Sequence, residues 1–497
     1  RMSGSEEMLY RSAWLLSKSR APGIVVDTSD SLRARRLYFT PPASTMKRGA
    51  DEAQLNGQTP PSKVISQRGR RLVDSPVIPY IEGVIDSFVN PYNLETGKGT
   101  FGLAVAENKL SYDILDPRVK EAFASTPTST FGYGIMHGRD YLRESIARLM
   151  REKFCKDPAC AGPTADELLC VSGAGAVLTH LFYCLCEVGD VVLIPAPYYS
   201  AFDFDLSAQA EVKISQVDLT PADGYALSPA LLDKAAKKAK EEKGRFPKVL
   251  LVTNPHNPLG RIMSRREMQE VIDWCEANDV HLVCDEIYAL SCFGQYLPEG
   301  SLPTEEFVSL GQLLKGKLGS NKHVVWALSK DFGASGWRAG VLWTQNQDLQ
   351  KAISNIASFT AISGPLQSVI SQVFDDAKFI DSYLEENSRR LASSCAMVMR
   401  TLTELRIPFL QPGAGMFIWM DFRSLLPAVS PANPSSAEAE DLLYKALWKE
   451  SSLVITPGLA QHASEPGWFR ICFAALSPAV LEKALENLKA WVESHRN

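Results

Sequence analysis

The sequence lacks the features that would place the protein in a membrane, on a nucleic acid or around a metal ion. None of its apolar runs approaches the roughly 20 residues that a membrane-spanning helix requires. Its net charge is −5, so there is no excess of positive charge to attract DNA, RNA or an anionic membrane. Its ten cysteines include no C-x-x-C pair, and neither Cys155 and Cys160 nor Cys184 and Cys186 have a matching second pair. We therefore expect no metal site, no nucleic acid and no membrane contact.

The chain has enough apolar residues for a large folded protein. Of its 497 residues, 45% are hydrophobic, which suits two or three domains with a substantial core. Several cysteines, among them Cys170, Cys284 and Cys472, lie inside apolar stretches. Buried thiols without a disulfide pattern are typical of a reducing compartment, so we expect a cytoplasmic location.

Residues 1–75 differ in composition from the rest of the chain. They are richer in Lys and Arg than in Asp and Glu, and they carry scattered Pro, Ser and Gly. This composition predicts a flexible N-terminal extension. The basic run Arg33-Ala-Arg-Arg36 fits an organelle-targeting leader, but the acidic residues before it are unusual for one, so targeting is the less favoured alternative.

From about residue 120, hydrophobic patterns of strands alternate with those of helices. Such alternation predicts an α/β fold, in which helices cover both faces of a mostly parallel sheet. The expected elements are a helix over 139–151, a strand over 168–172, a helix over 173–186, strands over 191–195 and 248–253, a helix over 265–276 with Ser264 and Glu267 as a reciprocal capping pair, and strands over 280–284 and 323–328.

Near residue 346 the pattern changes to longer helices mixed with strands. Helices are expected over 376–404 and 437–450, a surface loop over 427–438, and strands over 415–421, 453–456 and 467–473. This mixture predicts a second, α+β domain.

Lys330 is the most informative residue, because Arg338 follows it by eight positions across a glycine-containing turn. A lysine at the end of an apolar strand is placed to form a Schiff base, while the arginine can hold a phosphate. Together they point to pyridoxal 5'-phosphate as the cofactor.

Other polar motifs also begin where buried strands end. They are Ser172-Gly-Ala-Gly-Ala176, Asn254-Pro-His-Asn-Pro-Leu-Gly260 and Asp285-Glu-Ile-Tyr288, and Arg470 lies inside an apolar strand. Backbone N–H groups of the first motif can surround an anion at a helix start. A buried arginine is costly unless it meets an anion, so Arg470 is a candidate for binding a carboxylate.

These ordered motifs resemble the class I and II aminotransferases of fold type I, which depend on pyridoxal phosphate. A further stretch, Asn90-Pro-Tyr with Gly102-Leu-Ala-Val-Ala-Glu-Asn-Lys-Leu110, resembles the Asn-Pro-Tyr and Gly-Leu-Ala-Glu-Asn-Gln-Leu signatures of the 1-aminocyclopropane-1-carboxylate synthase branch. The resemblance covers roughly residues 80–495. It implies a homodimer with the active site at the interface, an arm over 76–120 that packs on the small domain, a large cofactor-binding domain over 121–345 and a small α+β domain over 346–497.

The resemblance also implies residue roles in a reaction on an α-amino acid. The catalytic residues would be Lys330, Asp285 and Tyr288. The cofactor-binding residues would be Gly173, Ala174, Gly175, Tyr199, Asn257, Asp285, Tyr288, Ser329, Lys330 and Arg338. The substrate-binding residues would be Arg470, Glu107 and Asn257.

Four positions depart from the family pattern. Gly175 stands where threonine is common, Ala327 where serine is common, and Lys109 where the branch has glutamine. Met136 replaces a tyrosine that, in the synthase branch, lies by the cofactor of the neighbouring subunit. Because methionine cannot replace a phenol, we place an aminotransferase first, a lyase that breaks C–S or other β or γ bonds second, and 1-aminocyclopropane-1-carboxylate synthase third.

A protein that kept the fold as a non-catalytic binding module is the alternative from another class. Retention of the whole set of motifs argues against it. The motifs do not fix the substrate side chain, which is read by loops.

Overall fold

The computed structural model describes residues 65–75 and 78–496, which fall into two compact units. In the first unit, up to Asn90, the helices α3 (Gln67–Val73) and α4 (Ile81–Val89) are described. Most of the extension expected over 1–75 lies outside the described residues, as does the basic run at 33–36; the part that is described contains helix α3. All candidate residues belong to the second unit, Pro91–Asn497.

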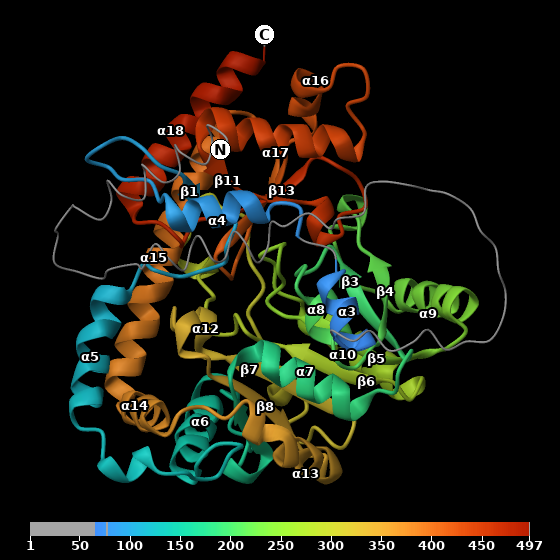
Figure 1. The fold of residues 1–497 in the computed structure, drawn as a ribbon, viewed down its shortest axis with the longest axis vertical. Coiled ribbons are helices and arrows are strands. Elements are labelled where there is room, and N and C mark those ends of the chain that lie inside the picture. Colours follow the sequence, from blue (N-terminus) through green and yellow to red (C-terminus); the bar gives the residue numbers. More distant parts are fainter. Residues whose placement is uncertain (1–64, 76–77, 497) are drawn as a thin grey trace. The chain divides into compact units, whose positions relative to one another are not determined.

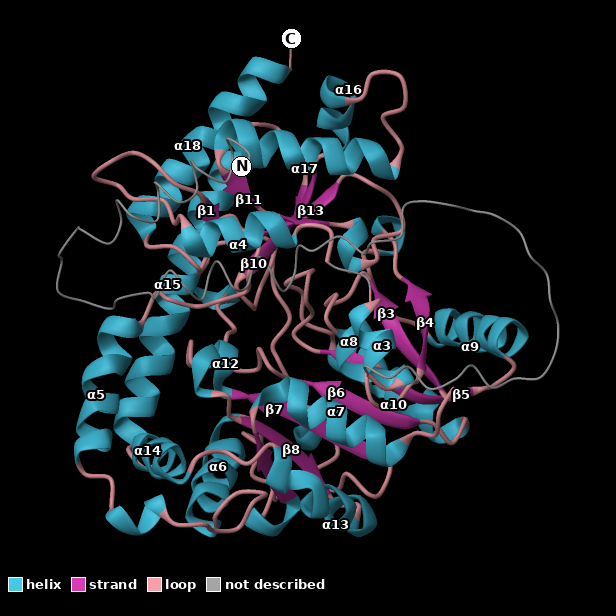
Figure 2. Cartoon of the chain, in the orientation of Figure 1, coloured by secondary structure: helices cyan, strands magenta, loops and turns pink. Residues whose placement is uncertain are grey.

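A seven-stranded sheet forms the centre of the second unit (Figures 1 and 2). Its spatial order is β2-β8-β7-β6-β5-β3-β4, and β8 alone runs antiparallel to its neighbours. The strands are β2 (Leu168–Val171), β3 (Val191–Ala196), β4 (Lys213–Asp218), β5 (Pro247–Thr253), β6 (His281–Asp285), β7 (Lys322–Ala327) and β8 (Gly340–Thr344). The α/β class with a mostly parallel sheet is thereby confirmed.

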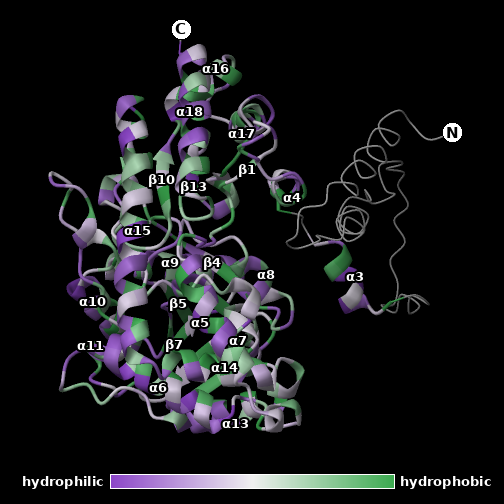
Figure 3. Cartoon of the chain, turned by 90° about the vertical axis from the view of Figure 1, so that its left-hand side faces the viewer, coloured by the Kyte–Doolittle hydropathy of each residue, from purple (hydrophilic) through white to green (hydrophobic). Residues whose placement is uncertain are grey.

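Successive residues of each buried strand enter two different cores. In β5, Leu250 and Val252 join one hydrophobic cluster, and Val249 and Leu251 join the other. This alternation follows from the two-residue period of a strand, and it makes a sheet covered on both faces hydrophobic throughout. Figure 3 shows the hydrophobic colour along central strands such as β5, and hydrophilic colour on outer helices such as α10.

Helices cover both faces of this sheet. One core is completed by α7 (Gly173–Leu185), α8 (Phe202–Ser207) and α13 (Gln347–Ile356). The other core is completed by α5 (Tyr112–Ala124), α6 (Asp140–Lys153), α9 (Pro229–Lys243), α10 (Arg265–Ala277), α11 (Leu310–Leu313) and α14 (Gly364–Phe374). The helices and strands expected over 139–328 are therefore present, with small shifts at their ends.

The start of α10 differs from the expectation in one contact. The Ser264 hydroxyl accepts the Glu267 N–H at 3.1 Å, as expected for a cap. The Glu267 side chain does not return to Ser264; its Oε1 accepts the Leu227 N–H at 2.7 Å, and Oε2 pairs with Arg261 at 2.7 Å. The reciprocal capping pair was wrong because a nearby arginine and a buried N–H compete for that carboxylate.

The chain after residue 346 contains long helices and a second sheet. The long helix α15 (Ala377–Glu404) contacts both α14 and α18 (Pro478–His495), and α17 (Ala437–Ser451) packs beside α18 (Figure 1). The sheet has the antiparallel order β12-β13-β10-β9, formed by β9 (Phe409–Leu410), β10 (Phe417–Asp421), β12 (Thr456–Pro457) and β13 (Trp468–Cys472). The mixture expected for this region is present.

Two details of this region were predicted wrongly. The strand expected over 453–456 is split, because Leu453–Val454 (β11) pairs in parallel with Phe101–Gly102 (β1) while Thr456–Pro457 joins the other sheet. The loop expected over 427–438 begins inside the short helix α16 (Leu426–Val429). The domain limits at 120 and 345 stay predictions, since residues 91–497 form one compact unit.

Candidate active site

Most candidate residues gather where the parallel strands end. Tyr199 follows β3, Asn257 follows β5, Asp285 ends β6, and Lys330 follows β7 in the short helix α12 (Leu328–Asp331). Carboxyl ends of parallel strands meet at one edge of a sheet, where the crevice of an open α/β sheet binds its ligand. The sheet topology therefore brings together residues that are far apart in the sequence.

Lys330 lies in a partly buried position at this edge. Its Nζ donates to the Ala106 backbone oxygen at 2.6 Å. Burial lowers the pKa of Lys330 to about 8, and the nearby Arg470 guanidinium acts in the same direction. A substantial fraction of the amine is thus neutral slightly above neutral pH, as a nucleophile or a base requires.

Asp285 and Glu286 are adjacent carboxyl groups in different surroundings. Asp285 Oδ1 accepts the Ile287 N–H at 3.3 Å, and no lysine or arginine in the described ranges forms a salt bridge with it. Glu286 Oε1 instead accepts the Leu310 N–H at 2.7 Å and so holds α11. Burial raises the pKa of each carboxyl to about 7. Neither carboxyl forms a salt bridge within the described ranges, and Asp285 is the one that lies at the crevice.

Asn257 connects Tyr288 and Arg470. Its Nδ2 donates to the Tyr288 hydroxyl at 3.4 Å, and its Oδ1 accepts from Arg470 Nη1 at 2.8 Å. Burial raises the pKa of the Tyr288 phenol well above its usual value, so the hydroxyl stays protonated and can donate. The rings of Tyr288 and Phe417 pack in a T-shaped arrangement, with 5.3 Å between their centroids.

Arg470 is 3% exposed and held by three protein acceptors. Besides Asn257, these are the Ala104 backbone oxygen and the Thr456 hydroxyl, both bonded to Nη2. A guanidinium has five N–H donors, so two remain, one of them on Nε, which has no hydrogen-bond partner within the described chain. The two remaining donors leave Arg470 able to bind a carboxylate oxygen.

The loop after β2 and the Arg338 guanidinium lie against each other. Gly173 begins α7 with φ +84°, and a β-carbon there would lie 2.5 Å from Arg338 Nη2. Only glycine therefore allows the guanidinium to approach the helix start so closely. Arg338 Nη1 donates to the Ser335 carbonyl at 3.0 Å, and Ser329 is buried, with its backbone carbonyl accepting the Ser335 hydroxyl at 2.9 Å. With the backbone of Ala174 and Gly175, this is a candidate phosphate site.

Tyr199 and Glu107 are the two remaining sequence candidates. Tyr199 is 39% exposed and packs edge-on against Phe202 at 5.4 Å. Glu107 forms an ion pair with Lys109 at 3.0 Å, and its charge raises the pKa of Lys330.

Asp205 was missed by the sequence reasoning. It lies on α8, and its Oδ1 is 3.6 Å from the place that a β-carbon on Gly175 would take. Burial raises the pKa of Asp205 to about 6, against the opposing effect of Arg338. In the sequence it reads as one acidic residue of Phe202-Asp-Phe-Asp, which is typical of a solvated helix face.

Gln461 and Thr456 were also missed. Gln461 Nε2 lies 3.5 Å from Asn257 Oδ1, and Thr456 accepts from Arg470. No sequence pattern predicts either residue, because a single amide or hydroxyl side chain has no distinctive spacing.

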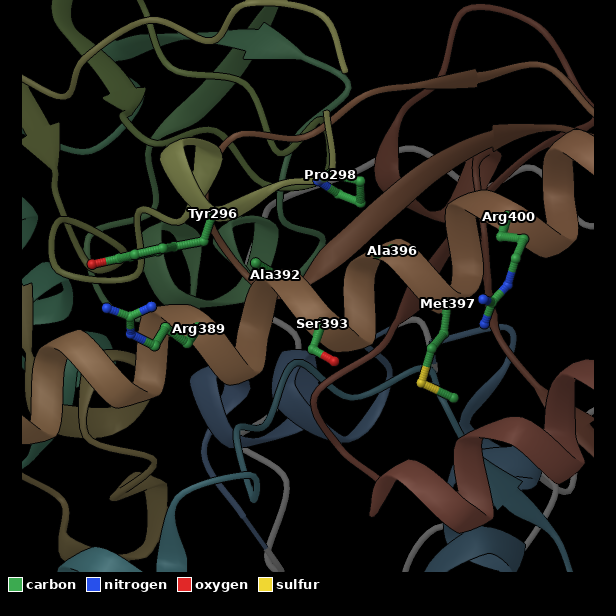
Figure 4. Close-up of a pocket in the computed structure, with 8 residues that line it drawn as sticks. All are labelled: Tyr296, Pro298, Arg389, Ala392, Ser393, Ala396, Met397 and Arg400. Carbon is green, nitrogen blue, oxygen red and sulfur yellow. The ribbon is translucent and has the colours of Figure 1, made fainter. Parts of the chain in front are cut away.

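A groove outside this crevice contains none of the candidate residues. Its volume is about 460 Å³, and it lies between α15 and the turn at Gly294–Tyr296 (Figure 4). Arg389 stands over the Tyr296 ring at 4.7 Å and pairs with Glu385. Its small residues Ala392, Ser393 and Ala396 make it shallow, and we assign it no catalytic role.

Among the described residues, no helix is long and apolar enough to cross a membrane. All ten cysteines are free thiols, and seven of them are buried.

Known proteins agree with the fold and with the order of the motifs. The chain is 32% identical to 1-aminocyclopropane-1-carboxylate synthase 5 of Arabidopsis thaliana over 425 residues, covering 82% of this chain and 86% of the relative. It is 31% identical to 1-aminocyclopropane-1-carboxylate synthase of Malus domestica over 429 residues, covering 82% and 86%.

Solved structures share the fold at lower identity. Aspartate aminotransferase from Thermus thermophilus with maleate superposes with a TM-score of 0.68 at 20% identity, covering 86% of this chain and 100% of that one. An aromatic aminotransferase from Pyrococcus horikoshii gives 0.65 at 20% identity, covering 81% and 98%. Residues 99–488 match the family described as aminotransferase class I and II. The chain therefore belongs to the class I and II aminotransferase family of pyridoxal phosphate-dependent enzymes.

Proposed function

We propose that the protein is an aminotransferase that acts on an α-amino acid through Lys330. Asp285 would pair with the cofactor ring nitrogen, Tyr288 and Asn257 would bind the ring oxygen, and Arg470 would bind the substrate carboxylate. Arg338, Ser329 and the backbone of Gly173, Ala174 and Gly175 would hold the phosphate, and Tyr199 would stack on the ring. Glu107 lies at the substrate side.

The residues present fit pyridoxal phosphate. Asp285 is a buried carboxyl group without a cation, which suits a protonated ring nitrogen. The close approach of Arg338 to Gly173 offers a guanidinium and a helix start to one phosphate. Pyridoxal phosphate, when bound, supplies an electron-withdrawing ring for chemistry at the α-carbon of an amino acid.

The proposed role of Lys330 is to move one proton. Its amine, whose pKa is near 8, removes the proton from the substrate α-carbon and delivers it to another atom in the same crevice. Arg470 holds the carboxylate and thereby fixes which bond at the α-carbon faces Lys330. Transamination requires nothing further from the chain at this step.

One observation carries the proposal. Lys330 donates to the Ala106 carbonyl and Arg470 to the Ala104 carbonyl, two residues earlier on the same segment. A base and a carboxylate-binding group are thus bonded to carbonyls of one short segment, which suits a small substrate bound by both.

The test is mass spectrometry of the cofactor released from purified protein, before and after incubation with a pool of amino acids and no keto acid. We expect pyridoxal phosphate to become the pyridoxamine form. Cofactor that stays pyridoxal while an amino acid disappears would contradict transamination.

A second candidate, 1-aminocyclopropane-1-carboxylate formation, is favoured by the names of the relatives that cover 82% of the chain. Met136 stands against it, because it is partly buried among apolar residues and offers no hydroxyl. The same incubation with an amino acid that carries a sulfonium group on its γ-carbon separates the two by the cyclopropane product. Release of a keto acid and ammonia would indicate the eliminating lyase.

A second copy of the chain is the proposed partner. Phe131, Tyr133 and Phe359 are 71%, 99% and 83% exposed. Their segments adjoin, since a β-carbon on Gly364 would meet the Thr130 carbonyl. Exposed aromatic clusters of this kind mark protein interfaces. A homodimer in solution, converted to monomer by Tyr133→Asp with Phe359→Asp, is the expected result of light scattering. The free thiols favour a reducing, cytoplasmic location.

A further inference from the structure

Gln461 places a buried amide beside the substrate-binding arginine. It ends the turn at Leu459–Gln461 and is 1% exposed. Its Nε2 lies 3.5 Å from Asn257 Oδ1, and its Oε1 has no hydrogen-bond partner among the described residues. A buried polar atom left unpaired is destabilising, which a purely structural residue would avoid.

Asn257 Oδ1 has two donors on different residues. Arg470 Nη1 takes the closer position at 2.8 Å, and Gln461 Nε2 the looser one at 3.5 Å. A carbonyl oxygen has two lone pairs, so it accepts from both donors at once. The two donors together fix the direction in which the Asn257 amide points.

The position of Gln461 is fixed from both sides. Its backbone carbonyl accepts the Tyr198 N–H at 2.8 Å. The next residue, His462, bonds to Asp203 at 2.7 Å and to Gln216 at 2.9 Å, and stacks on the Tyr198 ring. These contacts hold the amide against Asn257 without using its side-chain atoms.

We propose that Gln461 is a positioning residue for substrate binding, which shares the Asn257 side-chain oxygen with Arg470 and so holds both groups in place for the substrate carboxylate. The shared contact also keeps Asn257 Nδ2 directed at Tyr288. This inference rests on the proposed function of Arg470 and Asn257.

Gln461→Leu and Gln461→Met remove the amide and keep most of its volume. Gln216→Leu is the matched control, because it removes an amide on β4 that bonds to His462, the residue after Gln461, and is not bonded to Asn257. The ligands are the amino acid found by the cofactor assay and its des-amino carboxylic acid, which keeps the carboxylate but has no reacting nitrogen.

We expect both Gln461 variants to raise KM and the Kd of the des-amino acid about 3–10-fold, the worth of one hydrogen bond, with kcat changed less. The pH midpoint of the absorbance of the loaded enzyme should also shift, because Asn257 adjoins the ring oxygen in the proposed site. Gln216→Leu should move neither quantity.

Unchanged Kd in both Gln461 variants, or equal loss in Gln216→Leu, overturns the inference and leaves the proposed function intact. If wild-type enzyme neither converts an amino acid nor binds the acid, the proposed function itself fails. Thermal unfolding shows whether each variant folds. If Gln461→Leu does not fold, the more flexible Gln461→Met gives the result.

Discussion

The two halves of the candidate site are built differently. On the proposed cofactor side, Asp285 is buried and Lys330 is partly buried, and desolvation moves their pKa values to about 7 and about 8. On the proposed substrate side, Arg470 is bonded to Asn257, Ala104 and Thr456. In the proposed site, the cofactor side is thus completed by a charged ring, whereas the hydrogen bonds of the substrate side are already present.

Replacing Lys330 should produce the largest change and tests the cofactor side. We expect Lys330→Ala to slow amino-acid conversion roughly 10³-fold or more, because general-base catalysis contributes on the order of 10²–10⁴. Borohydride reduction and mass spectrometry should find no cofactor attached to the variant. Lys445→Ala, at an exposed ion pair, is the control and should keep the attachment. If the cofactor stays attached in Lys330→Ala, the assignment of Lys330 as the attachment site is wrong.

Replacing Arg470 tests the substrate side. Arg470→Lys keeps the charge but not the planar set of donors that reaches three acceptors and leaves two N–H groups free. We expect kcat/KM to fall roughly 10²-fold or more, since removing one partner of a buried pair costs about 2–5 kcal/mol. Cofactor content measured by absorbance should stay near one per chain. Loss of the cofactor together with activity would mean that the two sides are not separate.

Asp285→Asn tests the proposed cofactor side through the pH dependence of protein stability. Burial raises the pKa of Asp285 from 3.8 to about 7, so in cofactor-free protein the folded state holds a proton that the unfolded chain releases in this range. Its contribution to stability therefore falls as pH rises from about 4 to 7. Asparagine does not ionise, so the variant should be more stable than wild type at pH 7.5, by a few kcal/mol at about 1.4 kcal/mol per pKa unit.

Denaturant unfolding at pH 4.5 and 7.5 measures this difference. Saturating pyridoxal phosphate should reverse the order at pH 7.5, because only the wild-type carboxylate can pair with a protonated ring nitrogen. Parallel curves for the two proteins at both pH values would contradict the assignment of a buried, unpaired Asp285.

The smallest expected effect compares two glycines of the phosphate site. Gly173→Ala puts a β-carbon 2.5 Å from Arg338 Nη2 at φ +84°, so we expect cofactor affinity to fall about tenfold, which is near 1.4 kcal/mol. At Gly175 the nearest atom is Asp205 Oδ1 at 3.6 Å, an ordinary contact, so Gly175→Ala should stay within about twofold. Fluorescence titration with pyridoxal phosphate gives both values. Equal losses would remove the distinction between the two positions.

The sequence allowed prediction of the sheet and of most residues at its edge, for a physical reason. Buried parallel strands are continuous apolar runs, and the polar residue that ends each run must lie at the shared edge. Asp285, Asn257 and Lys330 each follow such a run, and the structure brings these positions together.

Residues that reach the crevice from elsewhere were not predictable in the same way. Asp205, Thr456 and Gln461 approach through the packing of separate segments, and their roles depend on distances of a few ångströms. Glu267 shows the same limit, since a correct capping spacing was overridden by Arg261. Local patterns predict elements and their ends, while competition between contacts decides where a side chain finally binds.

The free cysteines allow the stability of separate parts of the protein to be followed chemically. Cys170 and Cys284 lie in the seven-stranded sheet, Cys395 in α15 and Cys472 in β13, and all four are buried with raised thiol pKa values. A pulse of alkylating reagent therefore labels each thiol only while its surroundings are open. Peptide mapping of the label would give a separate opening rate for each sheet and for the helix between them, using native residues as the probes.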